Sequence, residues 1–306
     1  MRGAITGAFS YTGRHVAERL LDAGHSVVTL TNHPRGGEIG GHPVDVHPLD
    51  FTDPDGLRRA LEGADVLFNT YWVRFDHGDV TFDSAVRNSG ILIDAARAAG
   101  VGRIVHVSIA NPSADSASRY YRGKAAVEEL LRASGVPHSI VRPTVIYGRG
   151  DVLVNNIAWM LRHSPVFGMP GDGRYGIQPV YIDDYADLLV DAAGRTEPSV
   201  AMDAVGPDAY EFRDLVRTIG RAVGARSLVV GLPPALALAG ASLFGLLVRD
   251  VVLTRSEVHE LMSGVLVSHA PSTCPTPFAS WLAEEAPTLG RRWSSELGRH
   301  FRRPAA

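Results

Sequence analysis

Short apolar runs alternate with longer amphipathic stretches through the first half of the chain. The apolar runs are rich in valine, isoleucine and leucine, and they predict buried strands at 3–6, 26–31, 44–49, 66–70, 103–107 and 138–142. The stretches between them repeat apolar residues at helical spacing and predict helices at 14–23, 54–61, 83–99 and 120–134. This alternation is typical of an α/β fold with a doubly wound parallel sheet.

The pattern changes after residue 142. Prolines and glycines crowd residues 145–176 around one helical pattern at 152–162, a strand-like and helical pattern returns at 178–193, and another strand-like run covers 199–205. The remainder is mostly helical, with breaks at prolines. We therefore expect a larger α/β domain of residues 1–150 and 177–206, and a smaller, mainly helical C-terminal part of residues 151–176 and 207–306.

One segment, 228–248, is almost wholly apolar. Pro233 and Pro234 divide it, and the apolar stretch that remains before Arg249 is shorter than the roughly twenty residues a spanning helix needs. We expect a buried helix or the wall of an apolar pocket. Contact with a membrane surface is the alternative, which we do not expect.

Composition narrows the class of protein. The chain has 306 residues, of which 45% are hydrophobic and 21% charged, as in soluble globular proteins. Its net charge of −3 gives no reason to expect nucleic acid as a partner. Cys274 is the one cysteine, and no signal sequence opens the chain, so we expect a cytoplasmic location. The histidines lack the close pairing of a metal site, so no metal is expected.

The stretch TGAFSYTG, residues 6–13, joins the first predicted strand to the first predicted helix. Gly7 allows a sharp turn and Gly13 allows the helix to approach the strand, while the helix start offers free N–H groups to a pyrophosphate. Ser10 replaces the middle glycine of the G-x-x-G-x-x-G spacing, and its hydroxyl could donate to a phosphate. The prediction is a dinucleotide-binding turn, rather than an ordinary tight turn, made by Gly7, Phe9, Ser10, Tyr11, Thr12, Gly13 and Arg14.

The end of the second strand bears on the choice of cofactor. Asn32 stands where an acidic residue would bind the 2′-hydroxyl of NAD. His33, Arg35 and Arg14 add positive charge nearby, which suits a 2′-phosphate. The sequence therefore favours NADP(H), with NAD(H) possible. The alternative is that Arg14 and Arg35 are ordinary surface residues.

Further cofactor contacts are expected where the next strands end. Asp50, followed by Phe51, could accept a hydrogen bond from the adenine amino group, or it could begin the turn that leads to Pro54. Asn69 and Thr70 close the fourth strand at the same edge of a parallel sheet. We assign all four residues to the cofactor site.

Tyr120 and Lys124 carry the clearest chemical signal. Their spacing places them on one face of a helix, and an ammonium beside a phenol favours the phenolate. Such a tyrosine can give a proton to a carbonyl oxygen as hydride arrives, and the lysine can also hold the nicotinamide ribose. The spacing alone is common, but here it opens the helix between the fifth and sixth strands. Tyr121 lies three residues from Lys124, so which tyrosine faces the cofactor stays open.

The chain resembles a short-chain dehydrogenase/reductase of the extended or atypical kind. It is similar to the NAD-dependent epimerase/dehydratase and NmrA-like groups, and most of all to the NAD(P)-binding proteins related to the 39-kDa subunit of respiratory complex I. The resemblance covers roughly residues 2–193 and rests on TGAFSYTG, RNSGILIDAARAAGVGRIVHVS, YYRGKAAVEELLRASG, VPHSIVRPTVIYG and QPVYIDDYAD. It implies a Rossmann-type fold.

The resemblance also implies roles for matched positions. Tyr120 would be the general acid/base, Lys124 its partner and ribose anchor, and Ser108 a donor to the substrate oxygen. Asn88 would be structural or relay protons, and Arg142 and Pro143 would lie along the nicotinamide. The sequence lacks the serine pair and the Tyr-Gly of many epimerases, and related NmrA-like members often bind the nucleotide without turnover.

Two functions follow from these residues. The first is an NADP(H)-preferring oxidoreductase or epimerase that acts on an apolar small molecule, as the aromatic residues Tyr71, Trp72 and Phe75 and the apolar segment 228–248 indicate. The alternative is a non-catalytic dinucleotide-binding sensor, or an assembly or interaction protein. A monomer and a homodimer are both compatible with the sequence.

Overall fold

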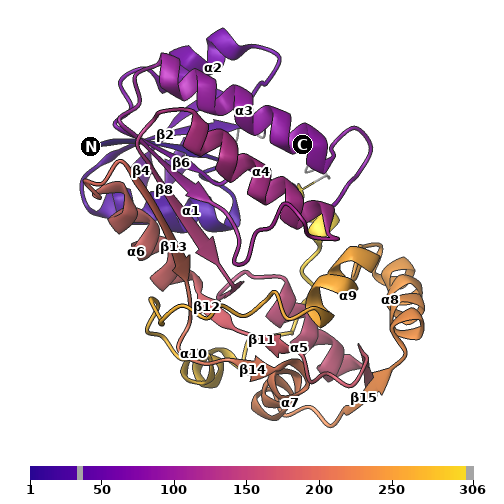
Figure 1. Ribbon diagram of the computed structural model, residues 1–306. Coiled ribbons are helices and arrows are strands. Elements are labelled where there is room, and N and C mark those ends of the chain that lie inside the picture. Colours follow the sequence, from indigo (N-terminus) through magenta and orange to yellow (C-terminus); the bar gives the residue numbers. More distant parts are fainter. Residues whose placement is uncertain (33–36, 301–306) are drawn as a thin grey trace. The chain divides into compact units, whose positions relative to one another are not determined.

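The computed structural model describes residues 1–32 and 37–300. The chain forms two compact units, one of Met1–Pro143 and Ile182–Ala204, the other of Thr144–Tyr181 and Val205–Ala306 (Figure 1). The first division comes a few residues before the expected boundary at 150. The reason is that β9 (Val145–Tyr147) pairs with β12 (Pro179–Tyr181) instead of joining the large sheet.

The first unit is built on a seven-stranded sheet in the order β13-β8-β7-β6-β1-β2-β5. All its pairings are parallel. The expected strands are present, with ends that differ by no more than one residue, so the α/β doubly wound class is confirmed. The strands are β1 (Arg2–Thr6), β2 (Ser26–Thr31), β5 (Asp45–Pro48), β6 (Val66–Asn69), β7 (Arg103–Val107), β8 (His138–Pro143) and β13 (Ser199–Ala204).

Helices cover both faces of this sheet. On one face α2 (Pro54–Leu61), α3 (Phe82–Ala98) and α4 (Arg119–Ala133) lie side by side, and on the other α1 (Tyr11–Asp22) packs against α6 (Ile182–Ala193) (Figure 1). A small hairpin of β3 (Glu38–Ile39) and β4 (His42–Pro43) follows β2. Between helices and sheet lies a core of fully buried aliphatic residues that includes Leu30, Leu67 and Ile104.

The chain reverses its direction across the sheet at β1. It runs from β1 through β2 to β5 on one side, and then returns to β6 on the other side of β1. In open parallel sheets, ligands bind beyond the carboxyl ends of the strands at such a switch point. The expected turn at Gly7 and the residues Asn69 and Thr70 lie there, because they follow or end β1 and β6.

The second unit is mainly helical, with short strand pairs. Its core brings Tyr147, Phe278 and Trp281 together, with ring centroids 4.9–6.1 Å apart. Besides β9 and β12, its strands are β10 (Val166–Pro170), β11 (Gly176–Ile177), β14 (Tyr210–Glu211) and β15 (Leu228–Leu232). Its helices are α5 (Leu153–His163), α7 (Phe212–Ala222), α8 (Pro234–Val248), α9 (Arg255–Met262), α10 (Phe278–Glu285) and α11 (Glu296–His300).

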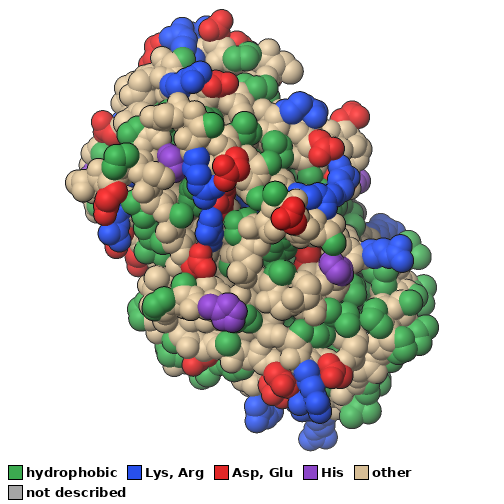
Figure 2. Space-filling model, in the orientation of Figure 1, with side chains coloured by type: hydrophobic (Ala, Val, Ile, Leu, Met, Phe, Trp, Pro, Cys, Tyr) green, Lys and Arg blue, Asp and Glu red, His purple; other side chains and the backbone are tan. Residues whose placement is uncertain are grey.

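The expectation of a buried helix within 228–248 is wrong. Of the residues of α8, only Ala237 and Gly245 are buried. Leu243, Leu246 and Leu247 are 72%, 78% and 78% exposed. Figure 2 shows apolar side chains along the edge of the unit where Figure 1 draws α8. Among the residues that the structure describes, no helix has both the length and the apolar character that crossing a membrane requires.

Candidate functional site

The turn between β1 and α1 has the geometry that its glycines predict. Gly7 adopts a φ of 73°, its N–H donates to Leu30 O at 2.8 Å, and the Ser10 N–H donates to Gly7 O at 2.8 Å. A Cβ at Gly13 would lie 2.2 Å from Gly7 O, which is closer than a side-chain carbon can approach a carbonyl oxygen. Gly13 therefore allows α1 to approach β1, and any other residue would push the helix away from the strand.

The start of α1 is open to an anion. Ser10 precedes the helix in an extended conformation, its side chain makes no capping hydrogen bond, and the first turn contains no acidic residue. The side chains of Asp53 and Thr81, by contrast, cap α2 and α3. Ser10 is exposed, and Phe9, Tyr11 and Thr12 are half-buried beside it. The unpaired N–H groups and positive dipole of a helix start suit a pyrophosphate, so these residues fit a dinucleotide.

Two of the residues expected to select the cofactor can be located. Asn32 is exposed directly after β2. Arg14 Nε donates to Glu18 Oε1 at 2.9 Å, and the Arg14 side chain is 61% exposed. An exposed pair of this kind is weak, so it leaves Arg14 free to turn toward a phosphate. His33 and Arg35 lie outside the described residues.

Asp50 and Phe51 are both engaged within the first unit. Asp50 Oδ1 accepts hydrogen bonds from Thr52 Oγ1 at 2.6 Å and from Thr52 N at 2.9 Å, and these bonds lower the pKa of Asp50. This is the turn-forming alternative of the sequence analysis. The ring of Phe51 packs against Tyr71, with centroids 4.8 Å apart.

Asn69 and Thr70 tie strand ends together at the switch point. The buried Asn69 accepts from Tyr71 N at 3.1 Å, and its Nδ2 lies 3.2 Å from His106 Nδ1 on β7. Thr70 N donates to Thr6 Oγ1 at 2.8 Å. The Asn69 side chain thus links neighbouring strands and does not face outward. Burial and the nearby Lys124 lower the pKa of His106 to about 3, so its ring is neutral.

Tyr120 and Lys124 lie on α4 beside one tryptophan. The ammonium of the buried Lys124 donates to Val107 O at 2.9 Å and lies 4.6 Å from the centroid of the Trp72 ring. Tyr120 packs edge-on against the same ring at 5.8 Å. Burial lowers the pKa of Lys124 to about 7, although Glu128 opposes this change. Tyr120 is half-buried, whereas Tyr121 is only 1% exposed, so Tyr120 is the more accessible tyrosine.

Ser108 and Arg142 meet at a buried carboxylate, Glu128. Ser108 Oγ donates to Glu128 Oε1 at 2.6 Å, and Arg142 donates to both carboxylate oxygens, through Nε at 2.9 Å and Nη2 at 2.6 Å. Arg132 Nη2 adds a bond of 2.8 Å. Burial raises the pKa of Glu128, but the bonds from Arg142 and Ser108 outweigh it and hold the pKa below its usual value. Pro143 accepts from Ala110 N at 2.9 Å at the end of β8.

This arrangement differs from the role that the resemblance implies for Ser108. A hydroxyl has one proton, and the Ser108 proton is engaged by Glu128. Ser108 can therefore accept a hydrogen bond from a ligand, but it cannot donate one while the bond to Glu128 persists. Arg142 is likewise held by Glu128.

Neither Glu128 nor the contact between Trp72 and Lys124 was predicted from the sequence. A signal for Glu128 was present, because Tyr120, Lys124 and Glu128 follow one another at i, i+4 spacing on one helix face. For Trp72 the signal was the glycine at position 123 within the predicted helix, which indicates that a bulky group packs closely there. In the structure that group is Trp72, whose ring would lie 2.9 Å from a Cβ at Gly123. Asn88 Nδ2 donates to Tyr71 OH at 2.9 Å, which is a structural contact next to this cluster.

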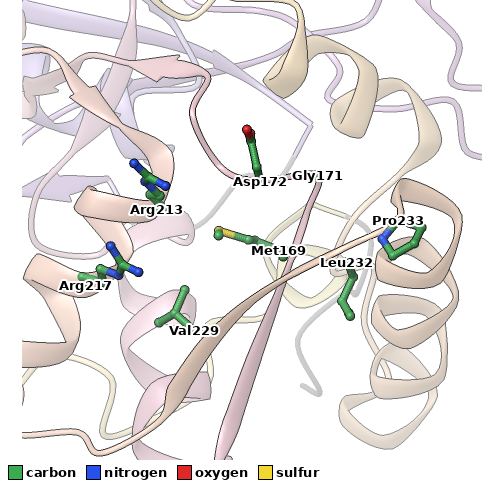
Figure 3. A pocket seen from close by; sticks show the side chains of 9 residues that line it. Met169, Gly171, Asp172, Arg213, Arg217, Val229, Leu232 and Pro233 are labelled. Carbon is green, nitrogen blue, oxygen red and sulfur yellow. The ribbon is translucent and has the colours of Figure 1, made fainter.

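The second unit has an open pocket of about 480 Å³ next to β15 and the start of α8 (Figure 3). Arg213 and Arg217 face it, but each has an acidic partner: Glu211 Oε2 lies 2.9 Å from Arg213 Nε, and Asp214 Oδ1 lies 3.5 Å from Arg217 Nη1. Asp172 adds a further negative charge. Asp172 is in turn balanced by Arg174, whose Nε lies 3.7 Å from Asp172 Oδ2, so the charges around the pocket sum to zero and identify no ligand. The other residues that line it are Met169, Gly171, Val229, Gly231, Leu232 and Pro233.

Comparisons with known proteins agree with the geometry of the first unit. A family model described as NAD(P)H-binding matches residues 7–154. The chain is 30% identical to (4-alkanoyl-5-oxo-2,5-dihydrofuran-3-yl)methyl phosphate reductase of Streptomyces griseus, over 72% of this chain and 73% of that protein. It is 29% identical to ceramide reductase of Caulobacter vibrioides, over 78% of this chain and 76% of that protein.

Other matches cover a smaller share of the matched protein, or are so low in sequence identity that they show only the fold. The chain is 25% identical to the mitochondrial NADH dehydrogenase (ubiquinone) 1 alpha subcomplex subunit 9 of Arabidopsis thaliana, over 69% of this chain and only 55% of that protein. The solved NADPH-dependent quinone oxidoreductase QOR2 of Escherichia coli, complexed with NADPH, is 20% identical. It aligns with a TM-score of 0.75 over 93% of this chain and 98% of that one. From these matches and the β1–α1 turn, the chain belongs to the NAD(P)H-binding short-chain dehydrogenase/reductase family, in its extended or atypical, NmrA-like group.

Proposed function

We propose that the protein is an NADP(H)-preferring oxidoreductase that reduces an apolar carbonyl compound, with Tyr120 as the proton donor. The observation that carries the proposal is the pairing on α4. Tyr120 keeps part of its surface exposed, while Lys124 is buried on the same helix face with its ammonium 2.9 Å from Val107 O, at the carboxyl end of β7. That edge of the sheet is where family members bind the dinucleotide.

The chain's own residues divide the chemistry as follows. A bound NADP(H) would supply the hydride, with its pyrophosphate at the start of α1. Tyr120 holds a proton on its hydroxyl and gives it to the carbonyl oxygen as negative charge develops there. Trp72 and Phe82, whose rings lie 5.8 Å from that of Tyr120, make its surroundings apolar and exclude water. Ser108 already donates its one hydroxyl proton to Glu128 and can only accept from a substrate, so Tyr120 is the donor to the carbonyl oxygen.

Two further observations support the finer parts of the proposal. No acidic residue follows β2 at Asn32, and Arg14 is exposed on the first turn of α1, which favours a 2′-phosphate. Two relatives are named as reductases, one of ceramide and one of a substrate with an alkanoyl group, and both kinds of substrate carry an apolar chain. The cytoplasmic location stays a prediction.

The test is hydride transfer to a panel of quinones, long-chain ketones and aldehydes, followed as loss of NADPH absorbance. We expect Tyr120→Phe to lower kcat by about 10²–10⁴-fold while NADPH binding is unchanged, since only the donated proton is lost. The matched control is Tyr121→Phe, which removes the neighbouring, buried hydroxyl and should leave kcat within about threefold. Equal kcat for wild type and Tyr120→Phe on a substrate that turns over would contradict the proposal.

A second candidate is a dinucleotide-binding sensor without turnover. The observation that favours it is that two polar groups of the site are already engaged, the Lys124 ammonium by Val107 O and the Ser108 hydroxyl by Glu128. A sensor would bind NADPH, but would oxidise it no faster than the Tyr120→Phe variant with every compound of the panel. Turnover that depends on Tyr120 would exclude it.

A further inference from the structure

Helix α8 presents an apolar stripe to the outside of the second unit. Its exposed positions follow helical spacing, and the leucines among them are 59–78% exposed. Residues 227–248 contain no charged side chain. We call this surface the α8 stripe: Leu236, Ala239, Gly240, Leu243, Leu246 and Leu247.

The helix is firmly held on its other side, so the exposed leucines are not a sign of a loose segment. The Phe244 ring packs against Trp159 and Trp293, with centroids 5.8 and 5.6 Å away. Gly245 is buried, and a Cβ there would lie 2.7 Å from Asp250 O. Ala237, Phe244 and Gly245 thus face inward and the leucines of the stripe face outward, the reverse of a helix on the surface of a soluble protein.

The outer face offers a partner that binds through hydrogen bonds one exposed hydroxyl oxygen, that of Ser242, and no side-chain donor. Ser242 is the one polar side chain of α8, and its hydroxyl donates to Leu238 O at 2.8 Å within the helix. The face is convex, since it is the outside of a single helix. A hydrocarbon phase needs neither hydrogen bonds nor a complementary shape, whereas a protein partner uses both.

The exposed charged residues that flank the apolar segment in the sequence are positive, while the exposed Asp172 lies beside Leu232 and Pro233 near the start of α8. Arg226 precedes the apolar segment, Arg249 ends α8 in a left-handed conformation, and Arg255 begins α9, and all three are exposed. The acidic residue that follows Arg249 in the sequence, Asp250, is buried and accepts from Trp293 Nε1, Glu296 N and Leu297 N.

On α9, which packs against α8, the acidic residues are half-buried and bonded locally. Glu257 accepts from Thr254, and Glu260 accepts from Ser256 Oγ. The exposed apolar patch also continues beyond the helix. α8 packs along β10, where Val166 pairs with Leu228 of β15, and these two side chains are 46% and 64% exposed.

We propose that the α8 stripe docks on the surface of an anionic phospholipid bilayer. The helix would lie in the interface, about 22 Å long, with its leucines among the acyl chains. Arg226, Arg249 and Arg255 would contact phosphate groups at its edges. This docking is independent of the proposed activity, because the residues of the dinucleotide turn belong to the first unit.

The test is flotation of the full-length protein with vesicles of phosphatidylcholine alone or mixed with phosphatidylglycerol. The wild type should float with the mixed vesicles, and the combined Leu243→Ser, Leu246→Ser and Leu247→Ser variant should bind about tenfold less or weaker still. The Arg226→Gln/Arg255→Gln variant should lose the preference for the anionic vesicles. Leu130→Ser, which changes a 40% exposed leucine of α4, is the matched control and should float like the wild type.

Any of three results would overturn the proposal. The wild type could fail to float with either kind of vesicle. Alternatively, the leucine variant could float to the same extent as the wild type. Sedimentation could also show a dimer that the leucine substitutions dissociate, without vesicle binding, in which case the stripe joins two copies of the chain. Thermal unfolding of each variant shows whether it is folded, independently of nucleotide binding, and a Leu246→Ser/Leu247→Ser variant replaces the triple change if that one does not fold.

Discussion

At the scale of single residues, the molecule is distinguished by two charged groups buried one helical turn apart on α4. Lys124 is 2% exposed and Glu128 is 1% exposed. Lys124 donates to a backbone carbonyl and lies over the Trp72 ring. The Glu128 carboxylate accepts hydrogen bonds from two arginines and a serine. Burying charge is unfavourable unless it is paired, so these contacts decide how stability depends on pH and on substitution.

The first prediction concerns Lys124 and pH. Its pKa is lowered from 10.5 to about 7 in the folded protein, so between these pH values the unfolded chain binds more protons. The free energy of unfolding should therefore rise with pH in this window, by up to about 1.4 kcal/mol for each pH unit. Lys124→Met should remove this contribution. Urea unfolding of both proteins at pH 7, 8 and 9 measures it, and parallel pH profiles would show that Lys124 does not titrate there.

The second prediction concerns Glu128. Glu128→Gln removes the charge that Arg142 and Arg132 share, and the Arg142 side chain is only 25% exposed. We expect a loss of about 3 kcal/mol in the free energy of unfolding, as when one partner of a buried pair is removed. Glu129→Gln is the control, because Glu129 is 74% exposed and pairs only with Arg132 among the described residues; it should cost less than about 1 kcal/mol. Equal losses would contradict the role given to Glu128.

The sequence predicted residues whose role depends on their neighbours in the chain. It predicted less where a side chain bonds to a residue far away in the sequence. Gly7 and Gly13 serve a turn that the neighbouring residues define, so the spacing predicts them. The side-chain partners of Ser108 and Asn69 come from α4 and β7, and no local pattern reveals which side chain a buried hydroxyl or amide will meet.

At the scale of elements, the β1–α1 turn depends on close approach of the helix and the strand. Gly13→Ala would place a Cβ 2.2 Å from Gly7 O, so α1 must move away from β1. We expect a loss of about 1–3 kcal/mol in stability and loss of dinucleotide binding, because the N–H groups of α1 move with the helix. Thermal unfolding and NADPH titration measure the two effects.

The matched control for this substitution is Gly90→Ala on α3. A Cβ there meets Leu130 at an ordinary 3.7 Å, and alanine favours a helix, so stability should be unchanged or higher by up to about 1 kcal/mol. If Gly13→Ala bound NADPH like the wild type, the turn would not be the phosphate site.

Helix α8 shows where hydrophobic patterning stops being informative. Its existence follows from the apolar run after two prolines, but a helix that is apolar on every side has no polar face to mark its orientation. The side that faces inward is set by Phe244 and Gly245, whose partners Trp159, Trp293 and Asp250 lie elsewhere in the second unit.

At the scale of the whole molecule, the alternation of strands and helices was sufficient for the large sheet. Right-handed parallel connections leave few arrangements for such an alternation, and the strand order observed is one of them. The strand pairs of the second unit were less accessible to prediction. Strands such as β11 and β14 have two residues each, which is too short to leave a period in the sequence. Their pairing depends on the fold around them.

The most direct test of the account is a fluorescence titration of the purified protein with NADPH and with NADH, with Gly13→Ala as the control. We expect saturable NADPH binding, about tenfold or more tighter than NADH binding, and no binding to the variant. Tighter binding of NADH would contradict the cofactor preference drawn from Asn32 and Arg14. Binding of neither nucleotide would contradict the claim that the turn from Gly7 to Gly13 holds a dinucleotide.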